Sequence, residues 1–164
     1  MTNKRWLALA DELATNLPSW AWPPILVGLC GSDAHGTKLP TSDPHGTDDL
    51  DVFAVTAQPP EFYLGVSALG HGRQDFNTNG HAVDITGHDA RKFIGLLGKG
   101  NPNVHSWLWA PEILYATPRG TLLVGARERL LSKRLFPALI GYATAQLHKM
   151  HQGVRSGYMG AKRK

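Results

Sequence analysis

The order of the expected elements predicts an α+β domain, because one helix is followed by three strands and then by a mainly helical remainder. The chain has 164 residues, of which 42% are hydrophobic and 18% are charged. This length predicts a single domain with a substantial hydrophobic core. The composition is that of an ordinary globular protein and excludes a generally disordered chain.

The first helix and the first strand follow from the spacing of apolar residues. Trp6, Leu9 and Leu13 recur at helical spacing, which predicts an amphipathic helix over residues 4–16. Prolines end this helix, and the short apolar run 25–30 that follows them predicts a buried strand.

A long polar segment separates this strand from two more. Residues 31–48 are rich in Gly, Pro, Ser, Thr and Asp, which predicts a loop of a length that is typical of functional segments. Residues 49–56 predict the second strand and residues 82–86 predict the third. The stretch 61–80 between them is ambiguous and fits a short helix followed by a turn.

The rest of the chain is expected to be mainly helical. Asp89 is suited to cap a helix over residues 90–97, whose apolar side chains share one face. Asn101 begins a turn before the next short segment. Residues 121–151 have a helical pattern, in which Pro137 suits the first turn of a second helix.

Charge is divided unevenly along the chain, although the net value is only +4. Residues 1–118 carry 7 basic and 12 acidic side chains, whereas residues 119–164 carry 10 basic and 1 acidic side chain. We therefore expect an acidic core over residues 1–118 and a basic helical segment over residues 119–164, packed as one compact domain. The basic excess favours a polyanionic partner, and a solvated basic helix face is the alternative.

The single cysteine, Cys30, excludes an intrachain disulfide and a cysteine-based zinc site. Its position in an apolar run predicts a buried and unreactive thiol. No run of about 18 apolar residues occurs, and the first residues lack the apolar core of a signal peptide. We therefore expect a cytoplasmic protein that does not associate with membranes.

Candidate chemistry is concentrated in a Gly-Ser pair and three aspartates. The first strand leads into Gly31 and Ser32, where glycine lets the backbone approach a phosphate closely and serine adds a hydroxyl donor. Asp49 and Asp51 are two residues apart in an expected strand, so their carboxylates face the same side. Asp84 lies between apolar residues in the third strand, where burial of an unpaired carboxylate is unfavourable.

Three carboxylates on adjacent strands are suited to hard divalent cations. Like charges at this spacing repel unless a cation lies between them, and Mg²⁺ or Mn²⁺ prefers oxygen ligands. If the strand of Asp84 lies beside that of Asp49 and Asp51, the three can hold two ions for a displacement at phosphorus. Asp48 is the alternative to Asp49, which we prefer because it shares the strand phase of Asp51.

These residues resemble the signature of the DNA polymerase β-type nucleotidyltransferase superfamily. The similarity extends to the sequence Lys-Gly-Asn-Pro-Asn at residues 99–103 and to Trp-Leu-Trp at residues 107–109. These segments resemble a branch of predicted nucleotidyltransferases of bacteria and phages that includes the RNA-ligase-associated polymerase-like proteins. The resemblance spans residues 25–164, and the basic segment resembles a short form of the helical part of that branch.

The resemblance implies a nucleotidyltransferase fold, with a small mixed β-sheet, flanking helices and a catalytic core in the acidic part of the chain. Gly31 and Ser32 would hold the β- and γ-phosphates of a nucleoside triphosphate. Asp49 and Asp51 would bind both of two Mg²⁺ or Mn²⁺ ions, and Asp84 would bind the catalytic ion and help to deprotonate the attacking group. The implied reaction is attack of an acceptor hydroxyl on the α-phosphate with loss of pyrophosphate.

Other polar side chains are candidates for contacts with the substrates. His35 and Lys38 follow Ser32 in the loop and are candidates for phosphate binding. The candidates for contacts with an RNA or DNA acceptor are Lys99, Asn101, Asn103, Lys162 and Arg163. The alternatives are a helix-to-helix turn held by the asparagines and a solvated C-terminal tail.

Two other functions fit parts of the sequence. The basic end fits a non-catalytic module that keeps the fold and binds nucleic acid or a partner. Scattered histidines fit a metallohydrolase, although no pair has the i, i+4 spacing of a metalloprotease helix. These histidines are His35, His45, His71, His81 and His88.

Overall fold

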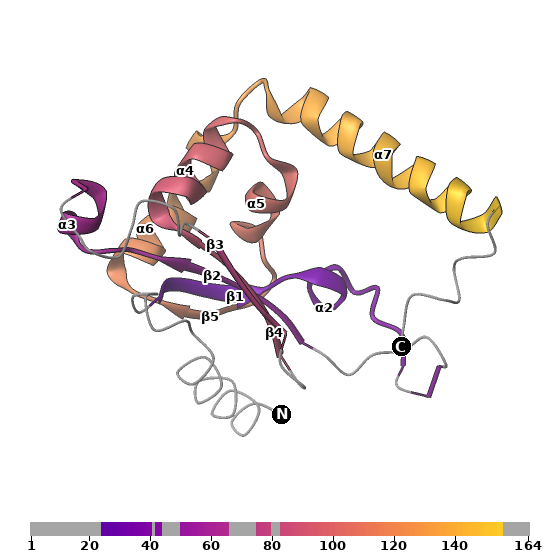
Figure 1. The fold of residues 1–164 in the computed structure, drawn as a ribbon, viewed down its shortest axis with the longest axis horizontal. Coiled ribbons are helices and arrows are strands. Elements are labelled where there is room, and N and C mark those ends of the chain that lie inside the picture. Colours follow the sequence, from indigo (N-terminus) through magenta and orange to yellow (C-terminus); the bar gives the residue numbers. More distant parts are fainter. Residues whose placement is uncertain (1–23, 41, 44–49, 66–74, 80–82, 156–164) are drawn as a thin grey trace.

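The computed structural model describes residues 24–40, 42–43, 50–65, 75–79 and 83–155. Five strands form one mixed sheet in the order β3-β4-β2-β1-β5 (Figure 1). Helices connect the strands and cover the sheet, which confirms the expected α+β class. The expected helix over residues 4–16 lies outside the described residues.

One half of the sheet is antiparallel. β1 (Pro24–Leu29) pairs with β2 (Leu50–Thr56) on one side and with β5 (Ile113–Ala116) on the other. The strands β1 and β2 confirm the first two strands expected from the sequence. The sequence does not predict β5, because this strand has only four residues, too few for a periodic pattern to be recognised.

The other half of the sheet contains a parallel pair. β4 (Val83–Asp89) runs parallel to β2 over its whole length and antiparallel to β3 (Asp75–Asn79). β4 confirms the third expected strand and extends it beyond residue 86. In the ambiguous stretch 61–80, the expected short helix is present as α3 (Pro60–Tyr63), but the turn expected at residues 77–80 was wrong, because β3 extends to Asn79 and pairs with β4.

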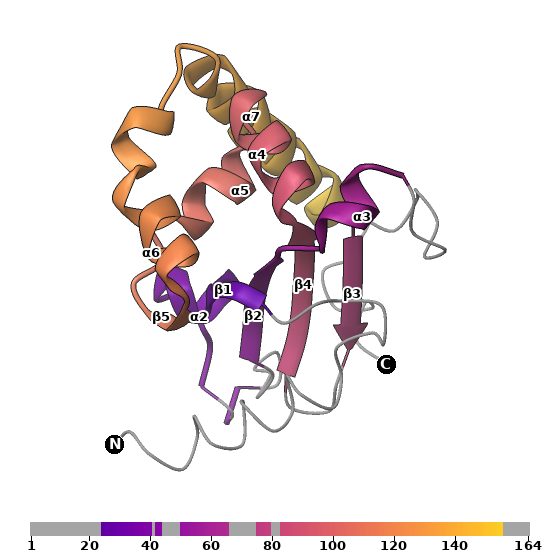
Figure 2. The same ribbon diagram turned by 90° about the vertical axis from the view of Figure 1, so that its left-hand side faces the viewer.

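Alternating side chains of the central strands form two hydrophobic clusters. On one face, Leu50, Val52 and Ala54 pack with residues of β1 and β4. On the other face, Phe53 and Val55 pack against two helices, α4 (Ala90–Gly98) and α5 (Pro102–Trp107). Figure 2 shows α4 and α5 together on one side of the strands. Burial on both faces explains why β2 is rich in apolar residues after Asp51.

Side-chain caps fix where α4 and α5 begin. Asp89 accepts hydrogen bonds from the backbone N–H groups of Arg91 at 2.8 Å and Lys92 at 3.2 Å, which confirms its expected role. Asn101 accepts a hydrogen bond from the N–H of Val104 at 3.1 Å. The expected helix over residues 90–97 is therefore confirmed, and the turn at Asn101 leads directly into a second helix.

The segment expected to be a loop over residues 31–48 begins with a one-turn helix instead. α2 (Gly31–His35) ends at Gly36, whose φ of +64° lies in the left-handed region that favours glycine. A single turn carries too few residues to show apolar periodicity, so the prediction of a loop was wrong at this end.

The C-terminal part is divided into three helical pieces rather than two. They are α6 (Pro118–Gly125), a 3₁₀ turn over Arg127–Leu130 and α7 (Leu135–Arg155). Pro137 lies in the first turn of α7, as expected. In Figure 1, α7 extends away from the strands as one long helix. None of the helices in the described ranges is both long enough and apolar enough to cross a membrane.

The Asn101 cap gives a direct test of this arrangement. Asn101→Ala removes the acceptor for the Val104 N–H and should lower the free energy of unfolding by about 1 kcal/mol. Asn103→Ala is the matched control, because the hydroxyl of Ser106 bonds to the backbone carbonyl of Asn103 and not to its side chain. Urea denaturation should show little change for this control. Equal losses for the two variants would contradict the capping role.

Candidate active site

Asp51 and Asp84 lie at neighbouring positions of the sheet. They are direct partners in the parallel register of β2 and β4, and each residue is half-buried. Adjacent strands are about 4.8 Å apart, so two carboxylates at partner positions on one face are close enough to share a cation. The strand pairing that the expected carboxylate site requires is therefore present.

Both carboxylates belong to the face of the sheet that α4 and α5 cover. Val52 and Ile85, which follow them in sequence, pack in the cluster on the opposite face. Because successive side chains of a strand alternate between faces, Asp51 and Asp84 share the face of Phe53. They lie at the start of their strands, beyond the apolar side chains that the helices bury.

Gly31 combines a backbone conformation and a close contact that together require glycine. Its φ is +65°, and a Cβ atom at this position would overlap the carboxylate of Asp51. The N–H of Cys30 donates to the carbonyl of Asp51 at 3.0 Å, so the contact between β1 and β2 continues up to this point. The Gly-Ser turn and Asp51 therefore form one continuous surface.

Ser32 lies in the first turn of α2, directly after Gly31. In the part of the chain that the structure describes, no side chain caps the N-terminus of this helix. The carbonyl of Ser32 accepts a hydrogen bond from the N–H of Thr37 at 3.0 Å, which closes the other end of the turn. Uncapped N–H groups at a helix start are the groups that bind phosphate in many proteins.

Cys30 precedes Gly31 and contributes a neutral thiol to the site. Burial is the main cause that raises the pKa of Cys30 from 9.0 to about 12, and the negative charge of Asp51 raises this pKa further. The thiol therefore stays protonated at neutral pH. This agrees with the unreactive cysteine that its apolar neighbours predict.

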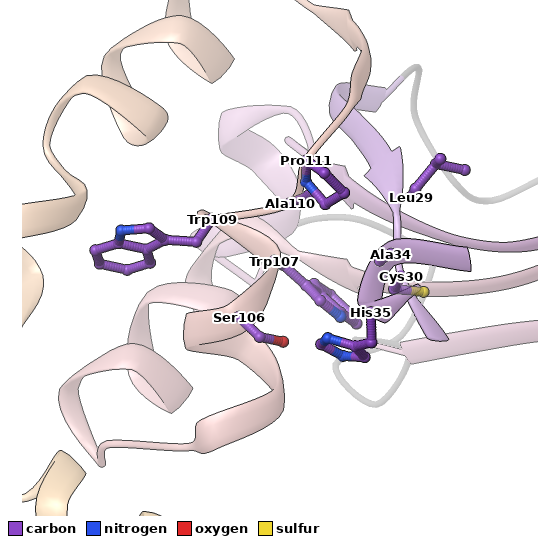
Figure 3. A pocket seen from close by; sticks show the side chains of 9 residues that line it. All are labelled: Leu29, Cys30, Ala34, His35, Ser106, Trp107, Trp109, Ala110 and Pro111. Atoms are coloured by element: carbon purple, nitrogen blue, oxygen red, sulfur yellow. The ribbon is translucent and has the colours of Figure 1, made fainter. Parts of the chain in front are cut away.

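A hollow of about 240 Å³ opens beside α2 (Figure 3). His35 borders it from α2, and the end of α5 borders it from the other side. The rings of His35 and Trp107 lie near each other in Figure 3. Cys30 borders this hollow, and its N–H donates to the carbonyl of Asp51 at 3.0 Å, so the hollow lies near the Asp51 end of β2. Its walls are formed by Leu29, Cys30, Ala34, His35, Ser106, Trp107, Trp109, Ala110 and Pro111.

The two tryptophans near this hollow differ in exposure. Trp107 is only 7% exposed and stacks against Phe53 and His88, with ring centroids 4.9 and 5.1 Å away. It is therefore mainly a core residue, as tryptophans at such positions usually are. Trp109 is 39% exposed, and the guanidinium of Arg127 lies 5.6 Å from the centroid of its ring.

Lys38, a candidate for phosphate binding, is paired within its own loop. Its Nζ atom lies 2.8 Å from a carboxylate oxygen of Asp33, and both side chains are one-fifth exposed. A phosphate would have to compete with this ion pair for Lys38. The role of Lys38 in nucleotide binding stays a prediction, as does that of His35.

The candidate acceptor contacts lie at the connection between α4 and α5. Asn101 caps the N-terminus of α5, and Lys99 is the C-terminal cap residue of α4. This is the helix-to-helix turn that we gave as the alternative for this motif. Contacts of Lys99 and Asn103 with an acceptor stay a prediction, and Lys162 and Arg163 lie outside the described residues.

Within the described ranges, no group of three His, Cys, Asp or Glu side chains lies close enough together to hold a metal ion. Asp49, the expected third carboxylate, lies outside these ranges, immediately before β2. The same is true of His45, His71 and His81, so the metallohydrolase alternative also stays a prediction. Of the remaining histidines of that alternative, His35 borders the hollow and His88 stacks on Trp107.

Asp51 and Asp84 nevertheless fit a hard divalent cation. They offer carboxylate oxygens at partner positions, and the neighbouring Cys30 thiol is neutral rather than a soft anionic ligand. Oxygen-only ligand sets favour Mg²⁺ and Mn²⁺ over softer metals. The lack of a Cβ atom at Gly31 leaves the room in which the Asp51 carboxylate lies against the glycine.

A family model described as RlaP, the RNA repair pathway DNA polymerase beta family, matches residues 14–159. The chain belongs to this family. Membership confirms the resemblance to the polymerase β-type nucleotidyltransferases and indicates a nucleotidyltransferase-like role. The match includes the Gly-Ser turn, the strands of Asp51 and Asp84 and the whole of α6 and α7. No curated protein matches the chain.

The hollow beside α2 is the part of the site that the sequence does not indicate. Ser106 and Ala110 border it, yet they follow Gly31 by more than seventy residues and carry no motif of their own. The sheet brings them to α2, because the N–H of Leu29 donates to the carbonyl of Glu112 at 3.1 Å.

The close contact at Gly31 can be separated from its backbone strain. Gly36 has a similar φ, but a Cβ atom added there would lie more than 4 Å from every described atom outside its neighbours in the chain. Gly36→Ala should therefore show the cost of the strained φ alone, about 1 kcal/mol of unfolding free energy. Gly31→Ala adds the overlap with the Asp51 carboxylate and should cost at least about 1 kcal/mol more. Urea denaturation of the two variants measures the difference. Equal losses would show that the Asp51 contact is not a close one.

The raised pKa of Cys30 predicts slow alkylation of the folded protein. The folded state holds the thiol proton more tightly than the unfolded chain, so the folded state loses stability as pH rises from 9.0 towards about 12. At pH 9 iodoacetamide should react with the folded protein more than about tenfold slower than with the urea-unfolded chain. Similar rates in the two states would contradict the buried, protonated thiol.

Proposed function

We propose that this protein is a metal-dependent nucleotidyltransferase that transfers a nucleoside monophosphate from a nucleoside triphosphate to an acceptor hydroxyl. The observation that supports this most strongly is the pairing of Asp51 with Asp84 beside Gly31. Family membership supports the same class of reaction. The acceptor that we favour is an RNA or DNA end.

In this proposal the carboxylates hold two divalent cations. Asp49, Asp51 and Asp84 would hold these ions, with Asp84 also placed to act on the attacking hydroxyl. When bound, Mg²⁺ or Mn²⁺ would supply positive charge against the negative charge that develops on the phosphoryl oxygens and on the leaving group. The repulsion between Asp51 and Asp84 at partner positions favours binding of such a cation.

The Gly-Ser turn would bind the triphosphate tail. The uncapped N–H groups at the start of α2 and the hydroxyl of Ser32 are donors for the β- and γ-phosphates. His35 would face the nucleotide from the same helix, and the nucleoside part would enter the hollow between α2 and α5. Such contacts would position the α-phosphate for attack, so that the protein contributes by orienting the reactants and not by forming a covalent intermediate.

The chemical step balances with the groups named. The oxygen of the acceptor hydroxyl forms a bond to the α-phosphorus, and the bond from that phosphorus to the bridging oxygen of pyrophosphate breaks. Asp84 helps to remove the proton of the attacking hydroxyl. The products are the nucleotidylated acceptor and pyrophosphate.

Transfer from labelled nucleoside triphosphates to RNA, DNA, protein and small-molecule acceptors tests this function. Asp51→Asn and Asp84→Asn should each lower transfer at least about a hundredfold, because each removes a charged oxygen ligand. Glu112→Gln is the matched control: it removes one exposed carboxylate outside the Asp51–Asp84 pair and should leave transfer unchanged. Chelation of divalent cations should stop the reaction.

The same experiment separates catalysis from a purely binding role. A non-catalytic module would bind RNA or DNA in a salt-dependent way, with no transfer product, and Asp51→Asn would not weaken that binding. The proposed function would be overturned if no acceptor were modified and if Asp51→Asn left the affinity for nucleoside triphosphate unchanged.

A further inference from the structure

A second and larger depression lies at the opposite end of the sheet from the carboxylates. This groove has a volume of about 1160 Å³ and is bordered by the residues after β2, by α3 and by the first turns of α4 and α6. Asp51 lies near the start of β2, and Thr56 at its end is five residues further, about 16 Å along an extended strand. Figure 1 shows α3 and α6 at one end of the strands and α2 at the other. The groove is therefore separate from the candidate active site.

Gln58 gives the groove an unsatisfied hydrogen-bonding group. It borders the groove and is only 5% exposed, yet among the described residues neither its side-chain oxygen nor its nitrogen has a hydrogen-bond partner. Its backbone N–H donates to the hydroxyl of Tyr63 at 3.1 Å, which fixes its position. Buried amides are almost always paired, so an unpaired one at a groove indicates a place where a ligand supplies the partners.

Two more buried polar atoms at this end of the sheet have no hydrogen-bond partner among the residues that the structure describes. They are the hydroxyl of Thr56 and the second carboxylate oxygen of Asp89, and both residues are 1% exposed or less. Thr56 and Asp89 are partners in the register of β2 and β4, so they meet at the end of the parallel pair. Thr56 and Asp89 do not line the groove themselves, but each directly precedes a residue that does, Ala57 and Ala90.

Two arginines give the groove a positive rim. Arg91 lies in the first turn of α4 and Arg119 in the first turn of α6, where the helix dipoles add positive potential. The caps Asp89 and Thr117 already accept hydrogen bonds from N–H groups of these turns, so the guanidinium groups rather than the backbone are the donors for an anion. Guanidinium groups bind phosphate with two parallel hydrogen bonds.

The remaining walls are mainly apolar. Pro59, Pro60, Leu64 and Ile94 border the groove, and Leu64 and Ile94 are 77% and 52% exposed. A ligand that fits this surface has an anionic group for the arginines, a flat ring for the apolar wall and an edge with both a donor and an acceptor for Gln58. A nucleotide unit has all three, and glutamine amides pair with the hydrogen-bonding edge of adenine in particular.

We propose that this groove is a nucleotide-binding site separate from the catalytic carboxylates. Arg91 and Arg119 bind the phosphate, the base lies on Pro59, Pro60 and Leu64, and the amide of Gln58 bonds to the edge of the base. The nucleotide is either free or one unit of a single strand, because both carry the same phosphate and base. The site does not depend on the proposed transferase activity.

Fluorescence anisotropy with a labelled, 5′-phosphorylated ten-residue oligoadenylate tests the site on the full chain, with chelator present to exclude divalent cations. Gln58→Leu and Arg119→Ala should each weaken binding at least about fivefold. Arg129→Ala is the matched control, because it removes the same charge from the exposed 3₁₀ turn away from the groove. It should change binding less than about twofold.

Two further measurements keep the result specific. Gln58→Leu replaces unpaired amide atoms by apolar ones, so its thermal midpoint should be unchanged or higher while binding is lost. A lower midpoint with unchanged binding would show a structural role and overturn the proposal. Asp51→Asn should leave binding to the groove intact, which distinguishes failure of this site from failure of the transferase.

Competition with adenosine monophosphate identifies the source of the nucleotide. Displacement of the oligonucleotide by the free nucleotide supports a site for a mononucleotide. Binding of the oligonucleotide alone, sensitive to Gln58→Leu, supports a site for one unit of a strand. Equal weakening by Arg119→Ala and Arg129→Ala, or no binding of either probe, would overturn the proposal.

Discussion

The contact between Gly31 and the carboxylate of Asp51 is the constraint on which the candidate active site depends. The left-handed φ of Gly31 turns the chain from β1 into α2, and its missing Cβ atom leaves room for Asp51. Any larger residue would push α2 away from the carboxylate. The Gly-Ser turn and the strand of Asp51 can therefore lie against each other in the candidate site because a glycine lies between them.

The parallel pairing of β2 and β4 adds the second carboxylate. A parallel connection needs a crossover of at least about a dozen residues, and here it includes α3 and the edge strand β3. The crossover returns the chain to the same end of the sheet, so Asp51 and Asp84 become register partners. Two half-buried like charges are unfavourable unless something offsets them, which is why the arrangement favours a cation.

The two aspartates of β4 show how position decides the role of a carboxylate. Asp84 lies near the start of the strand and is half-buried beside Asp51. Asp89 lies at the end of the same strand, is 1% exposed and uses one oxygen to cap α4. The first is placed to bind a charged ligand, whereas the second mainly stabilises the start of a helix.

Local signals in the sequence were sufficient for the strands and caps but not for contacts between distant segments. The apolar run before Cys30, the alternation after Asp49 and the cap at Asp89 all depend on neighbours within a few residues, and the structure has β1, β2 and α4 there. The short strand β5 and the one-turn helix α2 have too few residues for such signals. The hollow and the groove arise from residues that only the sheet brings together, so periodicity could not predict them.

The two ends of the sheet carry different charged groups, and this has a consequence for substrates. The carboxylates of Asp51 and Asp84 repel phosphate, whereas Arg91 and Arg119 attract it at the other end. A polyanionic strand would thus gain favourable contacts at the arginines before any at the carboxylates. Only after cations occupy the acidic end does that end also attract phosphate. Divalent cations would then decide whether a bound strand can bring its hydroxyl to the reactive end, independently of how tightly the strand is held at the groove.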